Sequence, residues 1–263
     1  NVNKLIREIK RTILLSKPRV RFGISPFGIY RNKKSTPDGS GSNTNGLQNY
    51  DDLYADVARW VKEGWIDYNI PQIYWEIGHP AADYITLIQW WNKNATREGT
   101  HLYIGQNVAR TMKADQLTRK MLYERSLSKV KGNCFWPANE ILWNNKGVAD
   151  SLKQNYHRYP ALIPAYTHLH NRAPQEVKKL KAEWTAQGYM LHWQAEQSKT
   201  NPELASYFVI YRFQNKESVN LDDPSKTNYL LPYDDGKRKY RYVVTAVDRF
   251  HNENQGKSKK VKL

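Results

Sequence analysis

The chain has 263 residues, of which 40% are hydrophobic and 13% aromatic, so it can bury a core in one large or two modest domains. Its formal net charge is +16; because no nucleic-acid-binding motif accompanies it, we expect a basic solvated surface, with an anionic polysaccharide or another polyanion as the alternative partner. No stretch of about 18 apolar residues predicts a membrane span, and the single cysteine, Cys134, excludes a disulfide framework.

Buried strands alternate with amphipathic helices along the first part of the chain. The predicted strands are 21–25, 67–74, 101–106 and 132–137, and the predicted helices are 3–15, 50–63, 82–94, 115–128 and 147–156. Four strands, each followed by a helix, are typical of one half of an eight-fold (β/α) barrel of the TIM type. We predict that Cys134 is a buried strand residue. We also predict that Trp60, Trp90 and Trp91 pack helices against strands and do not bind sugar.

A polar loop, residues 32–48, separates the first strand from the second helix. It contains three glycines and many hydroxyl groups, but the glycine spacing matches neither a phosphate-binding loop nor a dinucleotide-binding motif. We therefore predict no cofactor. Two interpretations stay open for this loop: a mobile cover over a binding cleft, or a long surface loop. No cluster of His, Cys and acidic residues has metal-ligand spacing, so no metal site is predicted.

The pattern changes at residues 171–174, where we place a domain boundary that gives domains 1–172 and 173–263. The second domain shows short alternating strands with turn residues between them. The predicted strands are 180–185, 189–194, 207–213, 228–231, 240–248 and 257–263. Trp193 and the tyrosine-bearing strand 240–248 resemble a fibronectin type III module, so we expect an all-β sandwich. It is either a rigid spacer or a module that binds sugar or a partner.

Three long motifs of the first part are SPFGIYRN, YDDLYADVARWVKEGWIDY and PQIYWEIGHPAADY. Together with later segments up to about residue 164, they resemble the glycosyl-hydrolase-like (β/α)8 barrel family of type 10, formerly a domain of unknown function. The resemblance implies that the chain corresponds to the second half of such a barrel. In the family, an Asp-rich motif that supplies a catalytic carboxylate precedes the first helix, so a fragment is expected. Secretion or an envelope location is implied by the resemblance alone.

Glu76 is the candidate catalytic residue. It follows the buried run 70–74, so we expect it at the C-terminal mouth of the parallel sheet, where chemistry is located in such folds. Glycoside hydrolysis requires two carboxyl groups that flank the scissile bond, and the matching family motif also carries a glutamate at this place. The alternative is that Glu76 caps a turn or pairs with Arg31.

Other polar and aromatic residues should converge on the same strand ends. The predicted sugar-binding residues are Tyr30, Arg31, Asn32, Gln72, Tyr74, Trp75, His79 and Asn107. Planar donors such as Arg31 and Asn107 suit sugar hydroxyls, and Tyr74 and Trp75 could stack on a sugar ring. Each of them could equally hold the loops together. Glu140 also follows a strand but departs from the family pattern, so we do not assign it a catalytic role.

These motifs and residues are compatible with two functions. The first is a glycoside hydrolase acting on a poly- or oligosaccharide, with Glu76 as one of its carboxyl groups. The second is a non-catalytic carbohydrate-binding or cell-surface interaction protein. Half a barrel leaves two open sheet edges, which invite pairing with another chain, so self-association is also expected.

Overall fold

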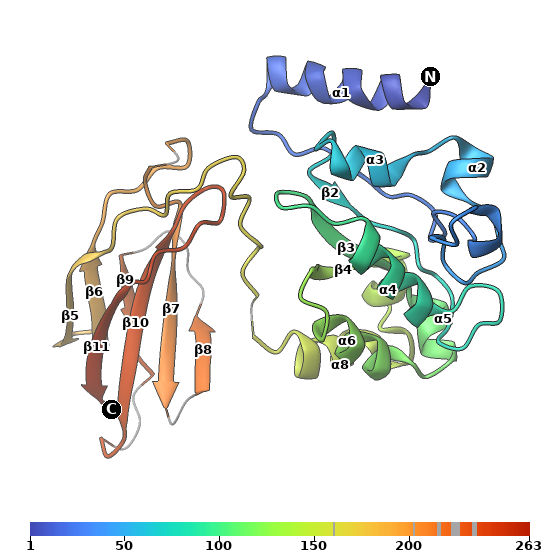
Figure 1. Cartoon of the computed structure of the whole chain (residues 1–263). Coiled ribbons are helices and arrows are strands. Elements are labelled where there is room, and N and C mark those ends of the chain that lie inside the picture. Colours follow the sequence, from blue (N-terminus) through green and yellow to red (C-terminus); the bar gives the residue numbers. More distant parts are fainter. Residues whose placement is uncertain (160, 202, 215–216, 222–226, 233–235) are drawn as a thin grey trace. The chain divides into compact units, whose positions relative to one another are not determined.

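The computed structural model describes residues 1–159, 161–201, 203–214, 217–221, 227–232 and 236–263. The chain forms two compact units, Asn1–Tyr156 and His157–Leu263, which Figure 1 traces in sequence colours. The domain boundary that we placed between residues 172 and 173 stays a prediction. The described strands form a parallel sheet in the first unit and antiparallel sheets in the second.

The first unit is built on a parallel sheet with the strand order β1-β2-β3-β4. These strands are β1 (Gly23–Ile24), β2 (Tyr68–Asn69), β3 (His101–Asn107) and β4 (Val130–Trp136). The first two are short, but bridges from Gln72 to Phe27 and to Gly105 continue the pairing beyond them. All four carboxyl ends therefore meet at one edge of the sheet. This mixed α/β arrangement is consistent with part of a barrel, as predicted.

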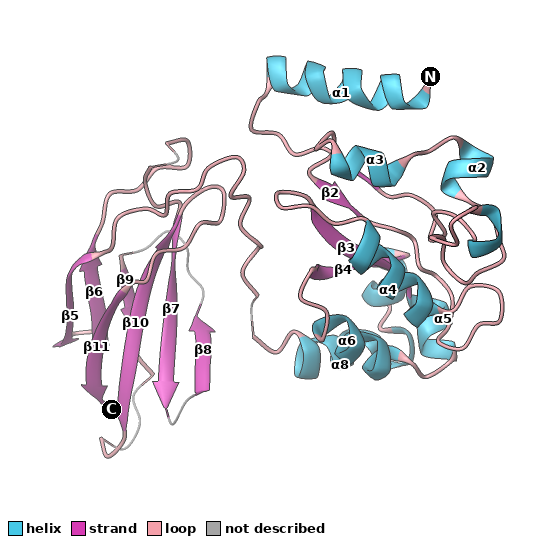
Figure 2. Ribbon diagram, in the orientation of Figure 1, coloured by secondary structure: helices cyan, strands magenta, loops and turns pink. Residues whose placement is uncertain are grey.

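Helices connect the strands (Figure 2). They are α1 (Val2–Ser16), α2 (Asn49–Leu53), α3 (Val57–Lys62), α4 (Tyr84–Asn94), α5 (Val108–Lys113), α6 (Leu117–Arg125), α7 (Ala138–Leu142) and α8 (Val148–Ser151), together with the 3₁₀ turns η1 (Lys33–Ser35) and η2 (Asn145–Gly147) and the π-helical turn η3 (Leu152–Tyr156). The prediction of one helix over 50–63 was wrong. Tyr54 adopts a left-handed conformation with φ of 55° and ends α2, and the side chain of Asp56 accepts from Arg59 N to start α3.

Helix α1 is fixed to the unit by polar contacts. Lys10 Nζ donates to both carboxylate oxygens of Asp67, at 2.8 and 2.7 Å, and Asp67 also accepts from the main-chain N of Phe22. Trp60 Nε1 donates to Asn3 Oδ1. Because Asp67 directly precedes β2, these contacts attach α1 to the start of the sheet.

The core of the first unit lies between the sheet and the helices. Leu102 and Ile104 of β3 are buried there together with Trp60 and Trp91. This confirms the prediction that these two tryptophans pack helices against strands. Trp90 is partly buried and stacks on Tyr30 with 5.0 Å between the ring centroids.

The prediction that Cys134 is buried was wrong, because its side chain is exposed. Along β4 the residues alternate: Asn133 points toward α6, where its amide contacts Met121, whereas Cys134 and Trp136 point to the opposite face. Trp136 is 58% exposed. The face of the sheet opposite the helices, which we call the inner face, is therefore open at β4 among the described residues.

The second unit consists of two antiparallel sheets, with strand orders β11-β10-β7-β8 and β5-β6-β9. The strands are β5 (Lys178–Thr185), β6 (Gly188–Gln194), β7 (Tyr207–Gln214), β8 (Glu217–Leu221), β9 (Asn228–Leu230), β10 (Lys239–Val247) and β11 (Lys257–Lys262). Six of them match the prediction within a few residues, and β8 was not predicted. Their inward side chains, including Trp193 and Tyr242, form one hydrophobic core.

Candidate functional site at the strand ends

Glu76 lies past the carboxyl end of β2. The main chain before it is still paired on both sides, since Gln72 N donates to Pro26 O and Ile73 N donates to Gly105 O, each at 2.9 Å. Beyond this pairing the chain leaves the sheet, and Glu76 is partly exposed. The carboxyl group is thus placed at the mouth of the sheet, where the apolar run before it predicts it to lie.

Helix α6 and the residue before it hold the main chain on both sides of Glu76. Lys120 Nζ donates to Trp75 O at 2.8 Å. Gln116 uses both ends of its amide on Ile77: Oε1 accepts from Ile77 N at 2.7 Å and Nε2 donates to Ile77 O at 3.1 Å. The position of Glu76 is therefore set by the buried side chain of Lys120 and the partly buried side chain of Gln116. Such support from packed neighbours is what a precisely placed functional group requires.

Asp83 continues this support into the turn after Glu76. As the N-cap of α4, its Oδ2 accepts from Thr86 N at 2.8 Å. Its other oxygen, Oδ1, accepts from Gly78 N at 2.6 Å. One carboxylate therefore starts a core helix and fixes the loop that carries Glu76.

We expect Asp83→Ala to lower the free energy of unfolding by about 1 kcal/mol, the usual cost of a lost N-cap. Urea unfolding followed by tryptophan fluorescence measures this change. Asp83→Asn, which keeps a capping oxygen, should recover most of the loss. An unchanged midpoint in Asp83→Ala would show that the cap does not stabilise α4.

A group of buried polar residues lies under the mouth. Lys120 and Glu124 are 0% and 2% exposed. Glu124 Oε1 accepts from Gln106 Nε2 at 2.7 Å and from the hydroxyl of Tyr84, and the ammonium group of Lys120 lies over the Tyr84 ring, 4.2 Å from its centroid. Burial raises the pKa of Glu124 to about 7. Burial lowers the pKa of Lys120 to about 8, against the opposing influence of the Glu76 and Glu124 carboxylates.

This buried polar group was not predicted from the sequence. Lys120 and Glu124 were assigned only to the helix predicted over 115–128, and a lysine four residues before a glutamate is normally an exposed pair on a helix surface. The available signal was weak: both residues flank Met121, an apolar residue on the buried side of the helix. Only the partners on α4 and β3 show that this side faces the core.

Tyr30, Arg31 and Asn32 follow β1, but their polar groups are engaged within the protein. Tyr30 OH donates to Asp56 Oδ1 at 2.8 Å, and burial, with Asp56 as a further cause, raises the pKa of Tyr30. Arg31 makes a two-point ion pair with Asp51, at 2.8 and 2.7 Å. The alternative that Arg31 pairs with Glu76 is therefore not realised, and sugar binding by these residues stays a prediction.

Asn32 is the centre of the polar loop 32–48. It is 3% exposed, its Nδ2 donates to Gly46 O at 2.9 Å, and its Oδ1 accepts from Thr44 Oγ1 at 2.9 Å. Its main-chain N donates to Gln48 Oε1 at 2.7 Å. These bonds tie the two ends of the loop together and favour the surface-loop interpretation over a mobile cover.

The remaining predicted residues lie nearer to Glu76. Gln72 Nε2 donates to Ser25 O at 3.0 Å. The rings of Trp75 and His79 are 6.3 Å apart, and His79 Nδ1 is buried with no hydrogen-bond partner in the described part of the chain. Tyr74 is partly exposed, and burial, with the neighbouring Cys134 thiol as a further cause, raises its pKa.

Asn107 and Trp136 form the other side of this region. Asn107 ends β3 and caps α5, because its Oδ1 accepts from Arg110 N at 2.9 Å. It is paired in register with Trp136 of β4. Trp136 was not among the predicted sugar-binding residues, although an aromatic residue at the end of a predicted strand was a usable signal. An exposed indole beside a side-chain amide is a surface on which a sugar ring can stack.

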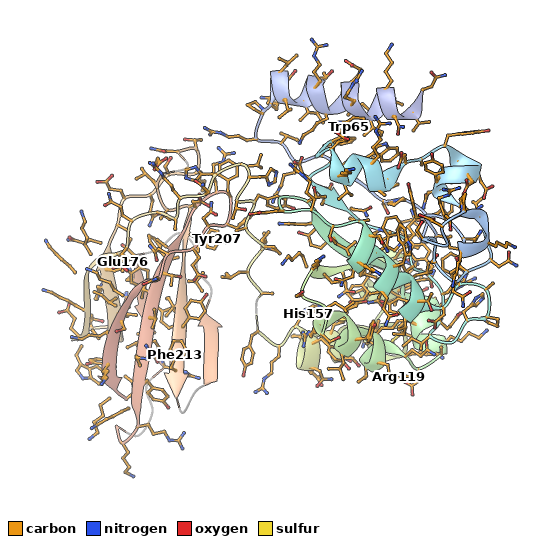
Figure 3. The ribbon with its side chains drawn as sticks, in the orientation of Figure 1. Trp65, Arg119, His157, Glu176, Tyr207 and Phe213 are labelled. Atoms are coloured by element: carbon orange, nitrogen blue, oxygen red, sulfur yellow. The ribbon has the colours of Figure 1, made fainter. Side chains whose placement is uncertain are left out.

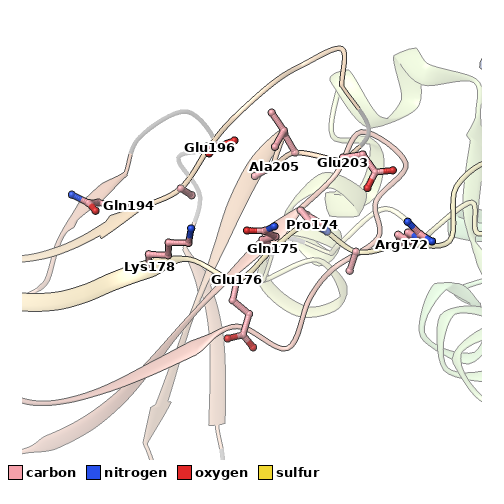
Figure 4. A pocket seen from close by; sticks show the side chains of 12 residues that line it. Arg172, Pro174, Gln175, Glu176, Lys178, Gln194, Glu196, Glu203 and Ala205 are labelled. Carbon is pink, nitrogen blue, oxygen red and sulfur yellow. The ribbon is translucent and has the colours of Figure 1, made fainter.

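The second unit contains a pocket of about 460 Å³, shown in Figure 4. Its walls combine Arg172, Glu176, Lys178, Glu196 and Glu203 with aliphatic and amide side chains, and no aromatic residue lines it. Within the described residues, no group of three His, Cys, Asp or Glu side chains is placed to hold a metal ion. None of the described helices is long and apolar enough to cross a membrane.

The amino-acid sequence is similar to those of several known proteins. Residues 1–121 match the family model for glycosyl hydrolase-like 10. The glycosyl hydrolase YngK of Bacillus subtilis is 36% identical over 275 residues, which cover 100% of this chain and 54% of YngK. The glycosyl hydrolase DigH of Escherichia coli K12 is 45% identical over 105 residues, which cover 40% of this chain and 24% of DigH. The chain thus spans about half the length of YngK.

Proposed function

We propose that the first unit hydrolyses glycosidic bonds in a poly- or oligosaccharide, because residues 1–121 match the family model for glycosyl hydrolase-like 10. One observation carries the proposal: Glu76 lies at the mouth of the parallel sheet, and Lys120 and Gln116 fix the main chain on either side of it. Fixing the reacting group in advance is the main structural requirement for such chemistry.

In this proposal Glu76 is one of the two carboxyl groups that glycoside hydrolysis uses. One carboxyl group protonates the leaving oxygen, and the other attacks the sugar carbon or activates a water molecule. Trp75 and His79 beside Glu76, and Trp136 with Asn107 across the sheet, would bind the sugar. The names of the matched relatives, which are glycosyl hydrolases, support the reaction class.

A second candidate function is carbohydrate binding without cleavage. The observation in its favour is that Trp136 is exposed next to Asn107 in the register of β3 and β4. Stacking on an indole and hydrogen bonding to an amide bind a sugar without any carboxyl group. This function would account for the site if Glu76 took no part in chemistry.

The proposal also includes the fold and the role of the second unit. Its described strands form one sheet of four strands and one of three, with Trp193 in the core between them, which fits a fibronectin type III module. Such a module would be a spacer or a second binding unit. We also propose that the protein is secreted or located in the cell envelope.

Incubation of the chain with a panel of neutral and acidic polysaccharides tests the reaction class, with released reducing ends as the readout. We expect release from at least one polysaccharide and none from heat-denatured protein. Retention of the same polysaccharides in affinity electrophoresis separates the two functions. Retention without release would favour carbohydrate binding, and neither retention nor release would contradict both.

A further inference from the structure

Like charges lie directly opposite each other on β10 and β11 of the second unit. The antiparallel register pairs Lys239 with Lys262 and Arg241 with Lys260. Their neighbours Tyr240, Tyr242 and Val261 point into the core, so the four cations project from the opposite side of the sheet, and all four are exposed. We call these four residues the basic face.

This arrangement costs stability. Side chains directly opposite on antiparallel strands have Cβ atoms about 5 Å apart, and like charges at that position are destabilising. Lysines on an exposed edge strand such as β11 can be explained as protection against edge-to-edge pairing. That explanation does not apply to Lys239 and Arg241, because β10 is paired with β11 on one side and β7 on the other.

Nothing in the described part of the chain neutralises the basic face. None of its four cations forms an ion pair with a described carboxylate. Glu253, on the loop after β10, accepts from the hydroxyls of Tyr211 and Thr245, at 2.7 and 2.5 Å, and forms no ion pair with these four described cations. Charges of one sign that the fold brings together without partners point to an external anion.

An aromatic surface continues the basic face across the sheet. Phe213 of β7 is the register partner of Arg241, and the guanidinium carbon of Arg241 lies 4.4 Å from the centroid of its ring. Tyr211 stacks on Phe213 with 6.2 Å between the centroids. Figure 3 labels Phe213 on this sheet. A row of cations beside aromatic rings suits a chain that carries both anionic groups and flat sugar faces.

We propose that the basic face, together with Phe213 and Tyr211, binds a linear polysaccharide that carries carboxylate groups. Along β10 and along β11 the cations are two residues apart, about 6.8 Å, so they form two parallel rows along the strands that can contact successive anionic groups of one chain. Arg241 offers a planar, two-point donor for a carboxylate. This binding is independent of Glu76 and would hold the second unit on an acidic polymer whether or not the first unit cleaves it.

The test uses the full chain and polygalacturonate, with binding measured by isothermal titration at low and at moderate salt. The variant replaces all four residues of the basic face: Lys239→Gln, Arg241→Gln, Lys260→Gln and Lys262→Gln. We expect at least about tenfold weaker binding at low salt, and a loss of most of the salt dependence. Because the replacements relieve like-charge repulsion, the variant should fold and should melt no lower than the parent chain.

A matched variant removes the same number of charges from exposed positions elsewhere in the second unit: Lys178→Gln, Lys179→Gln, Lys181→Gln and Lys199→Gln. We expect it to bind polygalacturonate like the parent chain.

Equally weakened binding in both variants would show that the binding depends on net charge alone and would overturn the proposal. Equal binding of neutral dextran, or tighter binding of duplex DNA than of polygalacturonate, would also overturn it. Loss of reducing-sugar release in Glu76→Gln with binding unchanged would leave this proposal standing, which separates it from the proposed hydrolase activity.

Discussion

Replacement of Glu76 by glutamine is expected to lower reducing-sugar release by roughly 10²–10⁴-fold, the contribution of a well-placed general acid or base. The amide is nearly isosteric with the carboxyl group but can neither give up a proton nor carry the negative charge. Lys120 and Gln116 bind only the main chain around residue 76, so the loop should keep its position in the variant. The loss should therefore appear in kcat, with KM changed little.

The measurement is the initial rate of reducing-end release from the polysaccharide that the parent chain cleaves best. Glu98→Gln is a matched control, because Glu98 is an exposed glutamate before β3, at the opposite end of the sheet. We expect the control to keep full activity. Full activity in Glu76→Gln would exclude Glu76 as a catalytic carboxyl group and would move the chemistry away from the end of β2.

Glu124 is expected to make the first unit less stable as the pH rises from about 4.5 to about 7. Burial raises the pKa of this carboxyl group from 4.5 to about 7 in the folded chain. Between these values the folded state holds a proton that the unfolded state has released, so stability falls with rising pH. A shift of this size corresponds to about 3 kcal/mol at 1.36 kcal/mol per pH unit.

Lys120 should act in the opposite direction at higher pH. Burial lowers its pKa from 10.5 to about 8, so between these values the unfolded state binds more protons and stability rises with pH. The two groups together predict a stability minimum between about pH 7 and pH 8. That minimum is a property of the buried pair and not of the protein surface.

Urea unfolding at a series of pH values tests this behaviour, with tryptophan fluorescence as the probe, since seven of the nine tryptophans lie in the first unit. Glu124→Gln keeps an acceptor for Tyr84 and Gln106 but removes the titration. We expect it to flatten the profile below pH 7 and to leave the rise above pH 8. The same fall in parent and variant between pH 5 and pH 7 would show that Glu124 does not titrate as proposed.

The sequence predicted the first unit well where the pattern is local. Alternation of apolar strands and amphipathic helices located all four parallel strands, and the position of Glu76 after an apolar run placed it at the strand ends. The end of α2 at Tyr54 was not predicted. The residue in the left-handed conformation is a tyrosine and not a glycine, so the sequence gives no sign of a helix end there. Helix periodicity alone would have continued through it.

Features that depend on contacts between distant segments could not be predicted. The hydrogen bonds that join the Asn32 amide to Thr44 and Gly46 within the loop are an example. The like-charge pairs of the second unit depend on the register of β10 and β11, which the sequence does not state. The burial of Lys120 and Glu124 could not be predicted either, because it depends on their packing against α4 and β3.

The single thiol of the chain, on Cys134, is exposed on the inner face of the parallel sheet. A maleimide dye would therefore label one known position beside Tyr74, without any engineered residue. The labelling rate then reports how well this face is covered: a second copy of the chain or a bound glycan that covers the sheet would slow the reaction, and an uncovered sheet would react at the rate of a free thiol. Thiol chemistry thus offers a direct way to follow what occupies the open side of the barrel-like unit.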